Sequence, residues 1–199
     1  MNFAHNRLCA GKGWAGFVGT TLLPWGLDGV QLGDDVLEIG PGFGATTRLL
    51  VDRASALSVL ELDERYCRRL RAELGGRVTV TRGDATAMPF RDGRFSAVLS
   101  FTMLHHVNTR ELQDQLLSEV VRVLAPGGVF AGTDSVGGSL RFRLLHLGDT
   151  LTLIEPGTFS ERLLAAGLSE PSVDVRGERM RFRARRLSAR SHGHERGQP

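Results

Sequence analysis

The stretch VLEIGPGFGATT, residues 36–47, decides the fold of this chain. It holds most of an apolar strand predicted over Asp35 to Ile39, then glycines at alternate positions, then a helix predicted over Ala45 to Val51. Glycines suit such a turn because a side chain would keep the backbone away from a ligand, and the free N–H groups at the start of a helix form a polar cradle. The stretch therefore predicts a ligand-binding turn between a strand and a helix.

Strands and helices alternate on both sides of this turn, which is typical of a mostly parallel sheet covered on both faces. In the last predicted strand Met180, Phe182 and Ala184 alternate with arginines, the period of a strand with one buried face. We expect an α/β fold with a doubly wound, Rossmann-like, seven-stranded, mostly parallel sheet, a C-terminal antiparallel hairpin and helices on both faces. The other predicted strands are 57–62, 77–81, 95–100, 129–133 and 172–175, and the other helices are 64–74, 110–124 and 158–166.

The 199 residues are expected to form one domain with additional segments. The domain itself is predicted over residues 34–186, preceded by an N-terminal lead-in or helical cap over residues 1–33. Residues 135–157 form a predicted insertion near the acceptor site, because insertions of this size are usually functional or mobile. Residues 187–199 contain too little apolar content to pack, so we expect a disordered basic tail.

Composition argues against a membrane or metal-binding protein. No apolar run reaches the roughly 18 to 20 residues that cross a bilayer, and residues 1–10 lack the charged-then-apolar order of a signal peptide. We therefore expect a cytoplasmic protein without a membrane span. Cys9 and Cys67 belong to no cluster with metal-ligand spacing, so no metal site is expected.

Positive charge is concentrated at the C-terminal end. Residues 175–199 contain eight arginines and two glutamates. Because the whole chain has a net charge of +3, the rest of the chain carries a net negative charge. Such a basic end could contact nucleic acid or anionic lipid. We favour the simpler interpretation, a solvated strand face that leads into a disordered tail.

The glycine turn alone allows two kinds of cofactor. Gly40-x-Gly42-x-x-Ala45 also satisfies the dinucleotide fingerprint, and Glu61 at the end of the second strand lies where an NAD-binding acid would lie. A dehydrogenase is therefore one alternative. Asp84, directly after the third strand, can accept a hydrogen bond from an exocyclic adenine amine, and an NAD site does not require an acid there.

Further motifs add a resemblance to a known family. Met88-Pro89-Phe90, the segment from Asp92 to Val98 and the segment from Glu119 to Gly128 follow in order. With these motifs the chain resembles the class I S-adenosylmethionine-dependent methyltransferases, specifically the small-molecule branch that includes the ubiquinone and menaquinone C-methyltransferases. The resemblance covers roughly residues 34–186 and implies S-adenosylmethionine as the cofactor.

The resemblance also implies roles for individual residues. The three glycines would approach the methionine and ribose portions of the cofactor, and Glu38 would help to orient its amino-acid end. Glu61 would hold the ribose hydroxyls, with Asp63 as the competing candidate. Asp84 together with Ala85 would recognise adenine. The implied cofactor-binding residues are Glu38, Gly40, Gly42, Gly44, Glu61, Leu62, Asp84 and Ala85.

The acceptor is less well indicated. Residues 101–107 read Phe-Thr-Met-Leu-His-His-Val, without the Asn/Asp-Pro-Pro-Tyr motif of adenine N-methyltransferases. We expect a small-molecule acceptor and no nucleic-acid partner, although the glycine turn with Glu61-Leu62-Asp63 also resembles the ribosomal RNA adenine dimethyltransferases, which keeps an RNA acceptor as an alternative. His105 and His106 are candidates for a catalytic base, and at least one of them is expected to be structural. Oligomeric state is not indicated.

Overall fold

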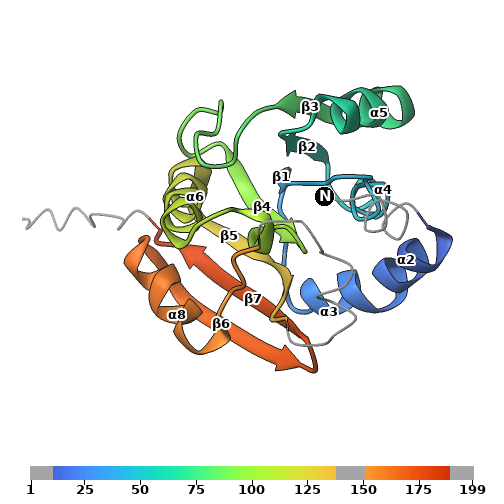
Figure 1. Cartoon of the computed structure of the whole chain (residues 1–199). Helices are drawn as coiled ribbons and strands as arrows, with labels where there is room; N and C mark the ends of the chain where they lie inside the picture. The colour runs from blue at the N-terminus through green and yellow to red at the C-terminus, as the bar shows by residue number, and fades with distance from the viewer. Residues whose placement is uncertain (1–10, 138–150, 189–199) are drawn as a thin grey trace, which may run out of the picture.

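The computed structural model describes residues 11–137 and 151–188. They form a seven-stranded sheet in the order β3-β2-β1-β4-β5-β7-β6, in which β7 runs antiparallel to both its neighbours and the other paired strands are parallel (Figure 1). This confirms the predicted fold class. The strands are β1 (Asp35–Ile39), β2 (Ala56–Glu61), β3 (Thr79–Arg82), β4 (Phe95–Phe101), β5 (Leu124–Ser135), β6 (Leu168–Arg176) and β7 (Arg179–Arg186).

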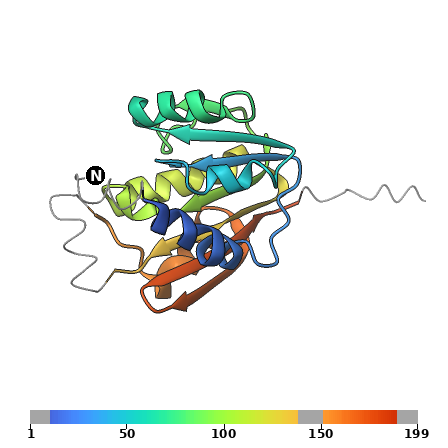
Figure 2. The same ribbon diagram turned by 90° about the vertical axis from the view of Figure 1, so that its right-hand side faces the viewer.

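Helical segments cover both faces of the sheet (Figure 2). One apolar core lies under α6 and α8, and the other lies under α4, α5 and the N-terminal helical segments. Successive strand residues point to opposite faces, so Leu37 belongs to the first core and Val36 to the second. The helical segments are α2 (Lys12–Phe17), the π-helix η1 (Val18–Leu22), α3 (Leu23–Gly26), α4 (Thr47–Leu50), α5 (Glu64–Leu74), the 3-10 turn η2 (Leu104–His106), α6 (Arg110–Val123) and α8 (Pro156–Ala165).

The fifth strand differs from its predicted bounds. The sequence predicted this strand over residues 129–133, yet β5 already begins at Leu124 and includes Pro126, Gly127 and Gly128. Leu124 pairs with Phe95, and the register then shifts so that Val129 pairs with Ala97. The extra residues are thus accommodated as an irregularity inside the ladder, which is how a β-bulge absorbs residues that would otherwise end a strand.

The predicted alternation in the last strand is present. Met180, Phe182 and Ala184 are buried in β7, and the Phe182 ring lies 4.9 Å from Phe130 and 5.3 Å from Phe159 between ring centroids. This strand therefore closes the core beneath α8.

Three predicted segments extend beyond the described residues. Residues 1–10 of the predicted lead-in, residues 138–150 of the predicted insertion and residues 189–199 of the predicted tail lie outside them. Across the described ranges, no helix has the length and apolar content needed to cross a membrane.

Candidate functional site

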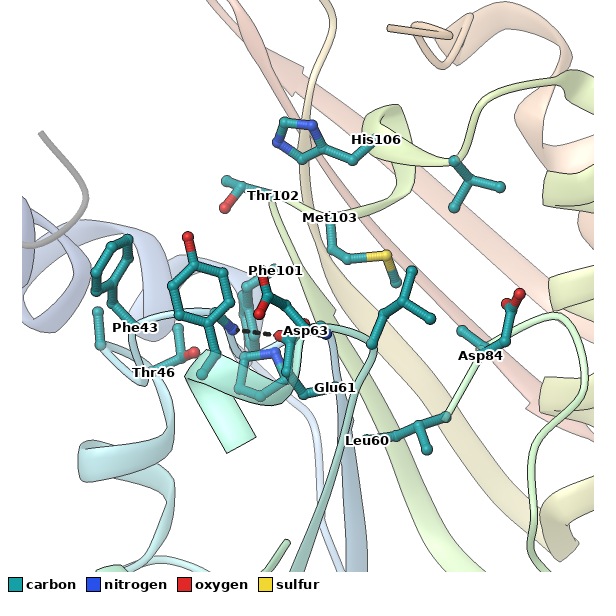
Figure 3. A pocket seen from close by; sticks show the side chains of 18 of the residues that line it. Phe43, Thr46, Leu60, Glu61, Asp63, Asp84, Phe101, Thr102, Met103 and His106 are labelled. Atoms are coloured by element: carbon teal, nitrogen blue, oxygen red, sulfur yellow. Dashed lines mark hydrogen bonds between the residues drawn. The ribbon is translucent and has the colours of Figure 1, made fainter. Parts of the chain in front are cut away.

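A cleft of about 590 Å³ opens at the carboxyl ends of β1, β2 and β4 (Figure 3). The strand order reverses there, since β2 and β4 lie on opposite sides of β1, and ligands of open α/β sheets bind at such a switch point. The volume is within the roughly 300 to 1,000 Å³ typical of ligand sites. Of the residues implicated by sequence, the cleft is lined by Gly40, Gly42, Glu61, Leu62, Asp84, Ala85 and His106, but not by Glu38, Gly44 or His105.

The glycine turn forms one wall of the cleft. Gly40 and Gly42 both have positive φ, at 64° and 52°, which a residue with a side chain adopts at a cost. A Cβ on Gly40 would lie 2.1 Å from Cγ of Met103, whereas a Cβ on Gly42 would enter open space. Gly44 instead faces α5, where a Cβ would lie 2.6 Å from Leu70. The turn therefore brings bare backbone to the cleft at Gly42.

Glu38 lies behind this wall, on β1. It is 1% exposed, and its two carboxylate oxygens accept hydrogen bonds from the hydroxyls of Thr46 and Thr47. Burial raises the pKa of Glu38 from 4.5 to about 7, although the two hydroxyl bonds oppose this. Thr46 lines the cleft and Glu38 does not, so Glu38 reaches the cleft through the threonine that it holds.

Two acidic residues compete at the end of β2. Glu61 accepts hydrogen bonds from the N–H of Gly42 at 3.0 Å and from the N–H of Asp63 at 2.9 Å, and burial raises its pKa. Asp63 caps the N-terminus of α5 by accepting the N–H of Arg65 at 2.8 Å. The Arg65 guanidinium also donates to Asp63 and lowers the pKa of that carboxyl to about 2. Both acids line the cleft, but Asp63 is already engaged by Arg65.

The far end of the cleft combines a carboxylate with an exposed apolar surface. Oδ1 of Asp84 accepts bonds from the N–H and hydroxyl of Thr86, both at 2.8 Å, and within the described part of the chain Oδ2 accepts none. Leu62 lines the same cleft and is 64% exposed. Such a pairing suits a flat ring that bears a hydrogen-bond donor.

The structure separates the two histidines. His105 is 2% exposed, and its Nδ1 lies 2.5 Å from Oδ1 of the fully buried Asp134. The other oxygen of Asp134 accepts the N–H of Leu104 at 2.8 Å. His106 lines the cleft, and its ring centroid lies 4.1 Å from that of His105. His105 therefore supports the turn on which His106 reaches the cleft.

Several lining residues were not identified from sequence. Two of them are Thr46 and Thr102. The positive φ of Thr102, 52°, is not predicted by the residues around it in the sequence. The side formed by the N-terminal helices is closed by Trp14, Val18 and Leu22; here the apolar content of residues 14–27 had indicated a segment that helps to shape the acceptor site. Among residues 11–137 and 151–188, no three His, Cys, Asp or Glu side chains come together in a way that could hold a metal ion.

Comparison with protein families decides the identity of the site. Residues 37–132, from the glycine turn into β5, match the family model described as a methyltransferase domain. Residues 37–132 therefore form a class I S-adenosylmethionine-dependent methyltransferase domain. The cofactor of the domain is S-adenosylmethionine, and the dehydrogenase alternative is set aside.

Curated relatives of the methyltransferase domain include ribosomal RNA enzymes. Ribosomal RNA small subunit methyltransferase A of Cupriavidus metallidurans is 32% identical over 148 residues, which are 65% of this chain and 52% of the relative. The chain thus spans about half the length of the curated relatives it matches. These names run against our expectation that nucleic acid is not a partner, and the branch that acts on small molecules is not confirmed by them.

Solved structures share the fold at low identity. A chain in the complex between the Haloferax volcanii Trm112 methyltransferase activator and a methyltransferase superposes with a TM-score of 0.72 at 18% identity, covering 94% of this chain and 99% of that one. PigF with SAH gives a TM-score of 0.66 at 21% identity, covering 87% of this chain and 56% of PigF. Both establish the arrangement of strands and helices around the methyltransferase cleft.

Proposed function

We propose that the methyltransferase domain transfers the methyl group of S-adenosylmethionine to a small-molecule acceptor. The observation that carries this proposal is the uneven distribution of charge in the cleft. Its charged lining residues all lie at the end of β2 or after β2 or β3: Glu61, Asp63, Arg65 and Asp84. The described lining residues from the N-terminal helices and from the segment after β4 carry no acidic or basic side chain other than His106. One half of the cleft thus suits a polar cofactor and the other a neutral acceptor.

The polar half of the cleft would bind the cofactor. Glu61 is the better ribose ligand because Asp63 is engaged by Arg65, and a carboxylate that accepts two hydroxyls forms charge-assisted hydrogen bonds. Asp84 would accept the adenine amine through the oxygen that Thr86 does not use. Bare backbone at Gly42 leaves room for the ligand's approach.

The neutral half of the cleft would bind the acceptor. S-adenosylmethionine supplies an activated methyl group when bound, so the protein has to orient a nucleophile and exclude water. Apolar walls that would exclude water are provided by Trp14, Val18, Leu22 and Phe101. His106 would be the histidine that removes a proton from an acceptor, because it lines the cleft while His105 is hydrogen-bonded to Asp134.

Thermal unfolding tests the cofactor assignment. S-adenosylhomocysteine, the demethylated product, should raise the melting temperature of the full chain, since a ligand at 100 times its dissociation constant contributes about 2.7 kcal/mol. NAD at the same concentration should produce no shift. A shift with NAD and none with S-adenosylhomocysteine would refute the proposal.

Ribosomal RNA is a second candidate acceptor, favoured by the names of the curated relatives. The segment after β4, residues 101–107, lacks the Asn/Asp-Pro-Pro-Tyr motif that adenine N-methyltransferases usually carry there, which favours the small-molecule proposal. Tritiated S-adenosylmethionine can be offered with purified bacterial small ribosomal subunits at low and moderate salt. Label in the RNA that declines steeply with salt would establish the second candidate, because phosphate contacts are salt-dependent.

A further inference from the structure

Thr102 has an unfavourable backbone conformation at the end of β4. Its φ of 52° is in the left-handed region, where a β-branched residue is a genuine outlier and the cost is about 1 to 3 kcal/mol. Its N–H donates to the carbonyl of Thr133 on β5 at 2.8 Å, which fixes the backbone in place. The fold therefore holds a threonine where glycine or asparagine would be less costly.

The side chain of Thr102 lines the cleft. It is half-buried, and its hydroxyl makes no hydrogen bond with any residue of the described ranges. In Figure 3 Thr102 lies on the same side of the cleft as His106, and Asp84 lies on the opposite side beyond Met103. The strained conformation thus presents a hydroxyl to the neutral half of the cleft, away from the carboxylate proposed to bind adenine.

The surroundings define what that hydroxyl can bind. The rings of Trp14 and Phe101 line this half of the cleft, so a flat apolar ligand can pack against them. An ionised group would lose its hydration without gaining an opposite charge at this end. A threonine hydroxyl both donates and accepts, so it can pair with the hydroxyl of a neutral ligand.

We propose that Thr102 is a specificity-determining residue whose hydroxyl binds the hydroxyl of a neutral aromatic acceptor. This rests on the proposed function, because the neutral half is the acceptor site only if the other half holds the cofactor. The backbone strain at Thr102 then serves acceptor binding, and neither folding nor cofactor binding requires it.

Four variants of the full chain separate these roles. Thr102→Gly removes both strain and hydroxyl, Thr102→Ala removes only the hydroxyl, and Thr102→Ser keeps the hydroxyl. Glu170→Gly is the matched control, because Glu170 has a similar φ of 51° at the bulge of β6 and does not line the cleft. Both glycine variants should melt higher than the wild type, by about 2 to 4 °C.

Calorimetric titration then measures ligand binding. S-adenosylhomocysteine should bind all four variants within twofold of the wild type. Phenol, titrated into each S-adenosylhomocysteine complex, should bind wild type, Thr102→Ser and Glu170→Gly equally, and roughly three- to tenfold more weakly to Thr102→Ala and Thr102→Gly. Toluene, which lacks the hydroxyl, should bind wild type and Thr102→Ala alike.

The opposite results overturn the proposal. A lower melting temperature or weaker S-adenosylhomocysteine binding for Thr102→Gly would assign the strain to folding or to the cofactor. Equal phenol binding by Thr102→Ala, or none by the wild-type complex, would refute the hydroxyl contact while leaving the proposed function intact. If the wild type fails to bind S-adenosylhomocysteine, the proposed function and this inference fail together.

Discussion

Glu38→Gln tests the energetic consequence of placing a carboxyl behind the glycine turn. Glu38 is fully buried, and within the described part of the chain its hydrogen-bond partners are the hydroxyls of Thr46 and Thr47, with no cationic side chain among them. Glutamine has nearly the same shape, cannot ionise, and can still accept from one hydroxyl while donating to the other. The substitution therefore removes the charge and retains the packing.

The magnitude follows from the pKa of Glu38, which burial raises from 4.5 to about 7. Between these values the folded state holds a proton that the unfolded state has released, so stability falls as pH rises through this interval. Below it both states are protonated, and above it both are ionised. The loss amounts to about 3 kcal/mol, since each pH unit corresponds to about 1.4 kcal/mol. The variant Glu38→Gln should not show this loss of stability.

Urea unfolding at pH values from about 5 to about 8 measures the difference between variant and wild type. Near pH 5 the two should have similar free energies of unfolding, within about 1 kcal/mol for altered hydrogen bonds. The free energy of unfolding of the variant minus that of the wild type should therefore be about 3 kcal/mol larger near pH 8 than near pH 5. Glu161→Gln, an exposed position on α8, serves as the control. Parallel pH profiles for wild type and Glu38→Gln would refute the reasoning.

Four further variants test other parts of the structure. Glu61→Ala should weaken S-adenosylhomocysteine binding by roughly tenfold or more in calorimetry while Asp63→Ala has little effect, and the reverse ranking would transfer the ribose contact to Asp63. Asp134→Ala should cost about 3 to 5 kcal/mol in urea unfolding, because the His105 ring loses its buried partner; a loss below about 1 kcal/mol would contradict this. Phe182→Ala should cost about 3 to 5 kcal/mol by the same method, and near-wild-type stability would show that the β7 core is not tightly packed.

Much of the fold was readable because its signals are local. An apolar strand that ends in glycines predicted the turn at Gly40 and Gly42, and alternation predicted the buried face of β7. The bounds of β5 were missed for a non-local reason. Pro126 and the glycines after it resemble a turn, and only pairing with β4 across a register shift makes them part of a strand.

The sequence by itself determined which chemical groups are available: backbone exposed by glycine, acids after successive strands, and paired histidines after β4. Only the tertiary structure decided how they are used. It engages Asp63 with Arg65 and leaves Glu61 bonded to the glycine turn, and it buries His105 against Asp134 on β5 while His106 lines the cleft. Neighbours in sequence receive such different environments because burial and charge pairing depend on strands that are brought together only by the sheet.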